Sequence, residues 1–545
     1  MKSAWSNQRN GKTPKAVAGT VLAIFLTILS SESAELVRSA WVDIGPDDKL
    51  TYKTTPAGDR IMDFSHAGYM GGGVALPDVP VKRTLQPSGT NDETVVIQRA
   101  LDEVTALKLE NGFRGAVLLG PGVFPCSGTI TISASGVVLR GIGSGSQAGP
   151  KTTIQMTGRP HLAIAVRTGS GAGRQTAPSG DEASAGMEPR FTTAETTIAD
   201  AYVPSGATSF TVADSTGFAA GDLIEIRRPV TPAWIKFMAM DDLVRDGRPQ
   251  TWLRPGTTTT AERRITAIAG KTIMVVVPLS DSFDAKFLNP PGTIVAKLRP
   301  TSRITQAGIE RIHIESPPQP ISHSQPHFTA LRVSGQDCWV RDVVCDETMN
   351  SIAVTGQRIT LTGVTVNRKA RHQGSSRPAE FAPNGGQVLL DRCAVNADNI
   401  WFVATGSGVA GPIVLLNCTF TGDSRAESHQ RWSTGLLYDN CRVPAGGIEF
   451  RNRGTMGSGH GWSMGWGVAW NCMAKDYVIQ NPPGAANWMI GCLGESTLKP
   501  RPFGTGPLLA EGIKDSPGKP VTPQSLYLAQ LAERLGKEAL KSIGY

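Results

Sequence analysis

From about residue 300 to 495, apolar and polar residues alternate in short runs that are separated by glycine and asparagine. Five runs look alike and share a cysteine at one place: VLLDRCAV, IVLLNCTF, LLYDNCRV, GVAWNCMA and NWMIGCLG. Three earlier runs, ITLTGVTV, WVRDVVCD and GIERIHIE, extend the same register backwards. The aligned positions are Ile312, Val343, Val364, Cys393, Cys418, Cys441, Cys472 and Cys492. Their spacing of 20 to 31 residues predicts an irregular repeat with one recurring strand.

Such a period favours a solenoid in which each coil stacks on its neighbour and buries a common core. The fold that we predict is therefore all-β, a parallel β-helix. An antiparallel sandwich or barrel is the alternative, but its hairpins need turn signals about every 8–12 residues. Asparagine precedes the shared cysteine at Asn417, Asn440 and Asn471. Asparagine tolerates sharp bends and can form hydrogen-bonded ladders between stacked strands.

The eight cysteines would suggest disulfides in an exported chain, but their context favours free thiols. Stacked parallel strands lie ~4.8 Å apart, whereas a disulfide needs Cβ atoms about 3.5–4.5 Å apart. We therefore expect each aligned cysteine to act as a small buried apolar residue. The chain contains no CxxC pair, which argues against a zinc site.

Two segments have helical periodicity. SGTNDETVVIQRALDEVTAL (88–107) has a polar start, followed by apolar Val96, Ile97, Ala100, Leu101, Val104 and Leu107. A helix there would cover the open end of the solenoid. PQSLYLAQLAERLGKEAL (523–540) predicts a second amphipathic helix that docks on the coils.

The helix after NDET and the following GFRGAVLLGPGVFPCSGTITISASGVVLRGIG resemble the start of the pectate-lyase-like superfamily. The resemblance covers about residues 60–165 and 300–495. It implies a right-handed parallel β-helix and a protein similar to polysaccharide lyases. This scaffold carries lyases, hydrolases, epimerases and inert adhesins, so the resemblance implies the fold more strongly than the reaction.

The first residues are typical of a secretory signal: a basic start precedes the apolar AVAGTVLAIFLTILSS (16–31) and a small-residue cleavage point. An uncleaved anchor is the alternative, although the apolar run is short for a membrane span. No later segment of the sequence is long and apolar enough to cross a bilayer. We expect a secreted or periplasmic protein that has no membrane contact after cleavage.

Composition shifts divide the rest of the chain. GSGAGRQTAPSGDEASAG begins a small-residue stretch, and the runs after it predict antiparallel strands with GD and AGK turns. The predicted organisation is a signal peptide (1–34), a cap with the first coils (35–168), a linker (169–189), an inserted β subdomain (190–297), the main coils (298–500) and a C-terminal tail with a helix (501–545).

The formal net charge of +8 suits a polyanionic partner without requiring one. No nucleic-acid recognition motif accompanies the charge, so we expect no nucleic-acid partner. An acidic polysaccharide is the expected partner, and we expect the protein to be a monomer.

Counting from the aligned positions predicts a lateral wall of polar residues. His323 and His429 each lie 11 places after an aligned residue, and Asn452 does so in the next repeat. Arg431 and Arg453 follow at 13 and 12 places. Arg368, Arg371 and His372 come 4 to 8 places after Val364. If the turns have similar lengths, these groups form an elongated cationic trough, which fits an acidic sugar chain.

β-Elimination on a uronate requires these residue types. The C5 proton is removed only when the adjacent carboxylate is neutralised, and a base near neutral pKa must take it. Histidine suits the base, and arginine binds carboxylates in a bidentate way. We predict His429 as the base, Arg431 and Arg453 as carboxylate ligands, and His460 as a second candidate base or acid.

Other residues are predicted to bind substrate: Asn452, Arg368, Arg371 and His372, with Trp432 and Trp462 stacking on sugar faces. A tryptophan in a glycine-rich turn otherwise fills a gap, and a lone surface arginine otherwise only improves solubility. No cofactor is expected. A calcium-assisted lyase stays open, although we find no compact cluster of oxygen ligands in the sequence.

Two other functions stay open. A hydrolase of the polygalacturonase type would share GHG (459–461), but inverting hydrolysis needs two carboxyl groups about 6.5–9.5 Å apart. The available acids, Asp391, Asp398, Asp423 and Asp439, form no persuasive pair. A non-catalytic carbohydrate-binding β-helix would explain the basic and aromatic residues without proton transfer.

Overall fold

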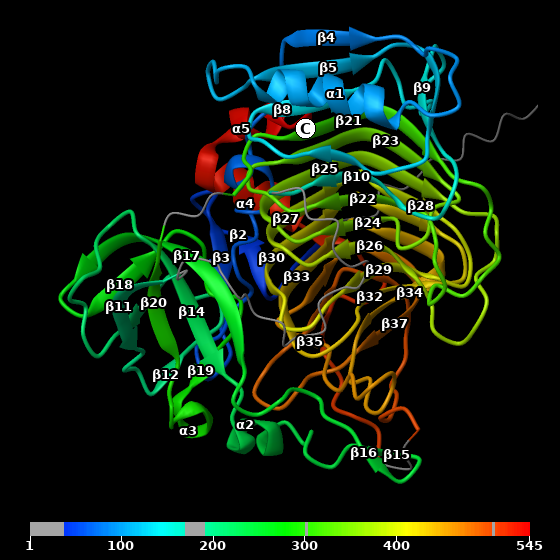
Figure 1. Ribbon diagram of the computed structural model, residues 1–545. Coiled ribbons are helices and arrows are strands. Elements are labelled where there is room, and N and C mark those ends of the chain that lie inside the picture. Colours follow the sequence, from blue (N-terminus) through cyan, green and yellow to red (C-terminus); the bar gives the residue numbers. More distant parts are fainter. Residues whose placement is uncertain (1–36, 169–190, 300–302, 504–506) are drawn as a thin grey trace, which may run out of the picture. The chain divides into compact units, whose positions relative to one another are not determined.

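The computed structural model describes residues 37–168, 191–299, 303–503 and 507–545. The signal peptide predicted for residues 1–34 and the linker predicted for 169–189 lie outside these ranges. A sheet of 27 strands, whose pairs are all parallel, winds through the coils as a stack of ladders (Figure 1). The predicted fold class, a parallel β-helix with an inserted antiparallel subdomain and terminal helices, is confirmed.

The strands of the coils form two principal ladders. The ladder with the aligned positions contains β8 (Val137–Arg140), β21 (Gly308–Glu315), β23 (Trp339–Asp346), β25 (Gln357–Asn367), β27 (Gly386–Asp391), β28 (Ala394–Asn396), β30 (Ala410–Leu416), β31 (Thr419–Thr421), β33 (Ser433–Asp439), β34 (Arg442–Phe450), β36 (Val468–Trp470), β37 (Met473–Ile479), β38 (Trp488–Ile490) and β39 (Leu493–Ser496). The second contains β7 (Ile130–Ile132), β10 (Leu162–Val166), β22 (Thr329–Val333), β24 (Ile352–Val354), β26 (Ala379–Pro383), β29 (Trp401–Thr405) and β32 (Arg425–Ser428).

The predicted register is the observed register. Ile312 pairs with Val343, which pairs with Val364 on the next coil. Farther along, Ala394, Thr419 and Arg442 pair in succession, each directly after an aligned cysteine. The inward side chains of these strands belong to one continuous apolar cluster that runs through the coils.

The residue before each aligned position bends the chain. Asn417, Asn440 and Asn471 have φ angles of 52°, 53° and 47°, in the left-handed region that asparagine tolerates. Their amides do not form the ladder that stacking suggested. Asn417 Nδ2 donates to the Tyr545 hydroxyl at 2.8 Å, and Asn471 Nδ2 donates to the Val521 carbonyl at 2.8 Å. The asparagine corner therefore anchors the C-terminal tail.

All eight cysteines are buried free thiols, as the spacing argument predicted. The stacked thiols bond to the coil before them: Cys418 Sγ donates to the Leu390 carbonyl at 3.4 Å, and Cys441 Sγ to the Leu415 carbonyl at 3.3 Å. Burial raises the pKa of Cys345, which keeps this thiol protonated.

Both segments that were predicted to be helical contain helices. α1 (Thr94–Thr105) buries Ile97, Ala100, Leu101 and Val104 against β5 (Gly115–Leu119) and β7. Val96 and Leu107, which were expected on the same face, are 41% and 40% exposed. The C-terminal segment forms two helices, α4 (Leu526–Leu535) and α5 (Lys537–Ser542), because Gly536 interrupts the predicted single helix. All helices in the described ranges are too short or too polar to span a bilayer.

The inserted subdomain is an antiparallel sheet with the order β11 (Phe191–Thr197), β20 (Ile294–Leu298), β14 (Leu223–Pro229), β17 (Thr258–Ala269), β18 (Thr272–Val275) and β13 (Ser209–Thr211). Two short helices, α2 (Pro232–Phe237) and α3 (Ala285–Leu288), accompany it (Figure 1). Its apolar cluster also includes Trp432 and Trp462 of the coils.

Asp439 connects the coils to α4. Its Oδ2 accepts hydrogen bonds from the Ser525 hydroxyl at 2.7 Å and the Tyr527 amide at 2.8 Å. Burial raises the pKa of Asp439 to about 7, against the opposing effect of these two bonds.

We expect the attachment of α4 to weaken as the pH rises. A carboxyl whose pKa is higher in the folded state stabilises the fold fully below its unfolded pKa, near 4, and this contribution is lost as the pH approaches 7. The unfolding temperature of the wild type should therefore fall between pH 4 and pH 7. In Asp439→Asn, this part of the decrease should be absent. Melting curves of both proteins at each pH would test the prediction, and parallel curves would contradict it.

Candidate functional site

Side chains that were predicted for one polar wall lie beside the second ladder, although several of them are buried. Trp401 begins β29, Glu427 lies in β32 and His429 follows that strand directly. One group of loops precedes these strands and carries His323 and His372, whose rings lie 5.5 Å apart. A second group follows the strands and carries Arg431, Arg453 and His460. The pairing of Glu427 with Ala404 and of Ser428 with Thr405 places His429 at the end of its rung.

His429 is held by a buried carboxylate. Its Nδ1 contacts Glu427 Oε1 and lies 3.2 Å from Arg453 Nη1. The imidazole is 21% exposed, whereas the Glu427 side chain is 1% exposed. Because both of these contacts use Nδ1, Nε2 is the nitrogen that is left to meet a substrate. A carboxylate on Nδ1 fixes the tautomer of an imidazole and orients it as a base.

Arg453 is paired inside the protein, which corrects one prediction. Its guanidinium forms an ion pair with Glu427, and the side chain is 4% exposed. Burial raises the pKa of Glu427, but the charges of Arg453 and His429 outweigh burial and hold the pKa below its usual range. Arg453 therefore keeps Glu427 ionised and is not free to take the carboxylate of a sugar.

His460 and Arg431 lie in the same group of loops as Arg453, near His429. The rings of His429 and His460 lie 4.8 Å apart with an interplanar angle of 65°. Burial, with the charges of His429, Arg453 and Arg431, lowers the pKa of His460 to about 2, so this ring stays neutral and cannot serve as a proton-donating acid. Arg431 Nη2 donates to Ser458 Oγ at 2.6 Å and to its carbonyl at 3.0 Å.

Trp401 and Arg377 belong to this surface and were missed. The Trp401 ring lies 5.5 Å from His429, and Arg377 and Arg453 lie over it at 5.2 and 5.0 Å. Glu427 was also missed as a residue of the site. A signal was present, because the Glu427–His429 spacing of two places puts both side chains on the same face of a strand.

A charged network continues onto the next coils. Glu449 pairs in register with Glu427, and Arg425 Nε and Arg451 Nη1 each lie 3.5 Å from it. Arg425 also bonds to Asp476 at 2.5 Å. Each buried carboxylate on this part of the wall therefore has an arginine beside it.

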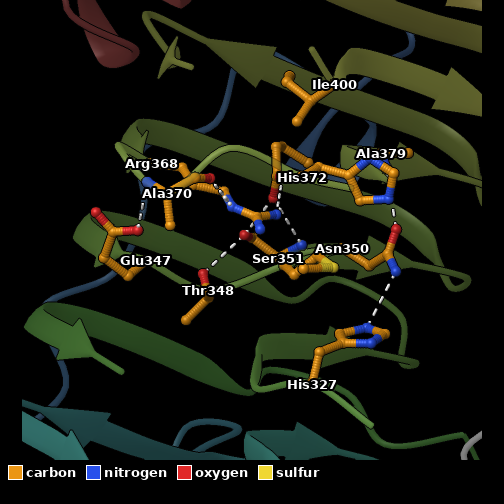
Figure 2. Close-up of polar contacts among 12 residues, drawn as sticks. His327, Glu347, Thr348, Asn350, Ser351, Arg368, Ala370, His372, Ala379 and Ile400 are labelled. Carbon is orange, nitrogen blue, oxygen red and sulfur yellow. Dashed lines mark hydrogen bonds and ion pairs between the residues drawn. The ribbon is translucent and has the colours of Figure 1, made fainter. Parts of the chain in front are cut away.

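The predicted residues Arg368 and His372 lie on the wall nearer the N-terminal coils (Figure 2). Arg368 is buried; its Nε donates to the Ala370 carbonyl and its Nη2 to the Gln319 carbonyl, both at 3.0 Å. Its Nη1 lies 3.9 Å from Glu380, so its charge is balanced internally. His372 is 4% exposed and neither ring nitrogen has a hydrogen-bond partner.

The surroundings of His372 keep it neutral. Burial, with the charges of His323, Arg368 and Arg377, lowers the pKa of His372 to about 4. Below it in Figure 2, Asn350 connects two segments: its Nδ2 lies 3.0 Å from His327 Nε2 and its Oδ1 accepts from the Ala379 amide at 2.9 Å. Arg371, by contrast, is exposed to solvent.

Three predicted substrate ligands are turned inward. Trp432 and Trp462 are each 3% exposed, and their indole nitrogens donate to Asp281 Oδ2 at 2.8 Å and to the Met238 carbonyl at 3.0 Å. Both rings pack against the inserted subdomain, so stacking on the proposed chain at the wall is not available to them. Asn452 is 1% exposed, and its Oδ1 accepts from the Gly454 amide at 2.7 Å. It shapes the loop instead.

The inserted subdomain holds the loop that carries Arg453 and His460. Trp252 Nε1 donates to the Trp462 carbonyl at 3.0 Å. Gly461 has a φ of 53°, and a Cβ there would lie 2.3 Å from Trp252 Cδ1. Only glycine therefore lets the loop approach this indole so closely.

Away from the wall, a groove of about 860 Å³ lies on the asparagine-corner side of the coils. Arg341, Asp342 and Arg392 are among the residues that line it. Three of its charged groups are engaged: Arg341 bonds to Glu310, Arg392 bonds to Asp391, and Asp342 accepts from Ser144 at 2.5 Å. The wall is the stronger candidate, because His429 presents a free nitrogen there. In the described ranges, no group of three or more His, Cys, Asp or Glu side chains is arranged to hold a metal ion.

The sequence matches no family model and no curated protein. Several solved structures are similar to this chain at low identity. The tailspike protein gp49 of Pseudomonas phage LKA1 is 13% identical with a TM-score of 0.39, over 74% of this chain and 64% of the other. The tailspike of E. coli bacteriophage HK620 in complex with pentasaccharide is 8% identical with a TM-score of 0.38, over 86% of this chain and 63% of the other.

The gp54 tailspike of Acinetobacter baumannii bacteriophage AP22, in complex with capsular saccharide, is 9% identical with a TM-score of 0.23, over 78% of this chain and 74% of the other. This chain spans less than two thirds of the LKA1 and HK620 structures. Likeness at this distance does not carry a function from one chain to another.

Proposed function

We propose that this protein is an exported polysaccharide lyase that cleaves a uronate-containing glycan by β-elimination. The observation that carries the proposal is the partly exposed His429, whose Nδ1 is fixed by buried Glu427 and whose Nε2 is left for substrate. Arginines lie around it, which suits the binding of an acidic chain. The neighbouring His372 and His460 stay neutral. The resemblance to the pectate-lyase-like superfamily agrees with this proposal.

In the proposed reaction, His429 Nε2 removes the C5 proton of the uronate. The electron pair forms the C4–C5 double bond, and the bond from C4 to the glycosidic oxygen breaks. The imidazolium then returns its proton to the departing oxygen. Arg431, with Arg377 beside Trp401, neutralises the sugar carboxylate, since Arg453 is already paired with Glu427.

Hydrolysis is less well supported by this wall. An inverting or retaining glycosidase needs a protonated carboxyl group as its acid. Glu427 is held ionised by Arg453, and Glu449 lies between Arg425 and Arg451. Of the acids considered from sequence, Asp391 and Asp439 bond to the C-terminal residues Tyr545 and Ser525. Asp398 and Asp423 lie in the loops before β29 and β32, where they accept from the Asp423 and Asn399 amides.

The test is to incubate the purified protein with pectate, alginate, glucuronan and glycosaminoglycans, with and without added calcium or chelator. A lyase produces an unsaturated sugar and a rise in near-ultraviolet absorbance. New reducing ends without absorbance would replace the proposal with hydrolysis. Retention of a glycan without any product would replace it with binding. The calcium arms decide whether a metal takes part.

A further inference from the structure

A pocket of about 150 Å³ is lined by side chains from β17 of the inserted subdomain, β25 of the coils and the C-terminal helix α4. Four of these side chains are arginines: Arg263, Arg264, Arg358 and Arg534. Among the described residues that line the pocket, Glu262 is the one carboxylate. The pocket therefore concentrates positive charge contributed by three segments that are far apart in the sequence.

The acids in and beside the pocket do not balance this charge. Glu262 is paired through both oxygens with Arg303, which is not a lining residue, at 2.8 and 2.5 Å. Asp337 accepts from the arginine of β25 at 2.6 Å, and Asp63 lies 3.6 Å from the ring of His66. The four arginines outnumber these three carboxylates even before the partner of Glu262 is counted.

Two of the arginines bond to uncharged acceptors. Arg263 is 4% exposed and donates to backbone carbonyls at 2.9 to 3.2 Å. Arg534 donates to the hydroxyl and carbonyl of Ser65 and to the carbonyl of Gly71, at 2.7 and 2.8 Å. Such acceptors satisfy the N–H groups but leave the charge, and a buried cation without an anion is costly. Burial, with the charges of Arg534 and Arg263, lowers the pKa of His66 to about 4, so this ring adds no charge.

Several nitrogens that line the pocket remain available to a ligand. Arg534 Nη1, Arg358 Nη1 and Gln357 Nε2 form no hydrogen bond with the described residues, and none of these atoms is sealed from solvent. Gly386 on the next coil leaves room for the glutamine amide, because a Cβ there would lie 2.3 Å from Gln357 Oε1. Donors from a helix and from a coil approach from different directions, which suits an anion with several oxygens.

We propose that this pocket binds one small tetrahedral oxyanion, phosphate or sulfate, which connects α4 and the inserted subdomain to the coils. The anion would offset the charges of Arg263 and Arg534 and accept from the open nitrogens. A water molecule takes about 30 Å³ of liquid volume, so the pocket has room for an ion of a few atoms and not for a sugar chain. His429 and the other residues proposed for β-elimination do not line this pocket, so the two proposals are independent.

The test measures binding to the full-length chain in chloride buffer at fixed ionic strength. Phosphate, sulfate and acetate are titrated by calorimetry, and melting temperatures are recorded over the same concentrations. We expect phosphate or sulfate to bind at one site and to raise the melting temperature, because an ion that binds only the folded state stabilises it. Equal effects of acetate and chloride, or no saturable binding of phosphate and sulfate, would overturn the proposal.

Gln357→Glu assigns the ion to this pocket. Gln357 is partly buried, and the change keeps the size of the side chain while it places a carboxylate among the arginines. We expect phosphate affinity to fall by roughly tenfold or more, because like charges repel. In phosphate-free buffer the same variant should melt at a higher temperature than the wild type. Gln147→Glu, at an exposed position in the loop after β8, is the matched control and should change neither quantity.

Arg534→Met removes one of the cations and should also abolish phosphate binding. This change deletes hydrogen bonds to Ser65 and Gly71, so Gln357→Glu, which deletes none of the described ones, is the decisive variant. Unchanged phosphate affinity in Gln357→Glu would show that the ion binds elsewhere. A lower melting temperature of this variant in phosphate-free buffer, or its failure to fold, would contradict the excess of positive charge on which the proposal depends.

Discussion

Replacing His429 with alanine is expected to lower the rate of β-elimination by about 10²–10⁴-fold, which is the usual contribution of a general base. His429 is the wall histidine whose Nδ1 is fixed by a carboxylate while its ring stays partly exposed. The rate of absorbance increase on the substrate found by screening measures the effect. His429→Gln should lose as much activity, because an amide cannot accept the C5 proton at neutral pH.

A distant histidine provides the matched control. His161 directly precedes β10, five rungs from the β32 rung of His429 along the second ladder. Its Nδ1 contacts the Arg159 carbonyl at 2.9 Å, and its ring packs on Phe328. His161→Gln should keep wild-type activity. Near-normal activity in His429→Ala, together with an unchanged melting temperature, would remove this residue from the mechanism even if the protein proves to be a lyase.

The coil register could be predicted because it depends on local and repeated signals. Each rung repeats an alternating strand, and the bend before it needs a residue that accepts positive φ, which explains Asn417, Asn440 and Asn471. Stacking then places side chains from different coils on one surface. For this reason His429, His460 and Arg431 could be grouped before the fold was seen.

The direction in which individual side chains point was harder to predict. Trp432 and Trp462 are on the expected segment, but the inserted subdomain covers them, and no local pattern in residues 190–297 shows which coils it will meet. Arg453 was expected to face substrate, whereas it forms an ion pair with Glu427. Pairing between a strand residue and a loop residue 26 places away depends on the path of the loop, which glycines such as Gly454 and Gly461 determine.

Removing the charge of Glu427 is expected to destabilise the protein by about 3–5 kcal/mol. In Glu427→Gln, Arg453 would keep its charge in a site where it is 3% exposed, without its anionic partner. Deleting both charges should restore part of this loss, so Glu427→Gln/Arg453→Met should be more stable than the single variant. Chemical unfolding of the three proteins measures the differences.

The effect of pH gives this prediction a second readout. The pKa of Glu427 is lower in the folded state, so its stabilising contribution is present above the unfolded value, near 4.3, and is lost as the pH falls through the folded value. The stability gap between wild type and Glu427→Gln should therefore be full at pH 7 and narrow in acid. Glu538→Gln is the matched control, since Glu538 is 82% exposed beside Lys541 and should change stability by less than about 0.5 kcal/mol. If the two glutamate variants behaved alike, the buried pair would not stabilise the wall, and the orientation of His429 would need another cause.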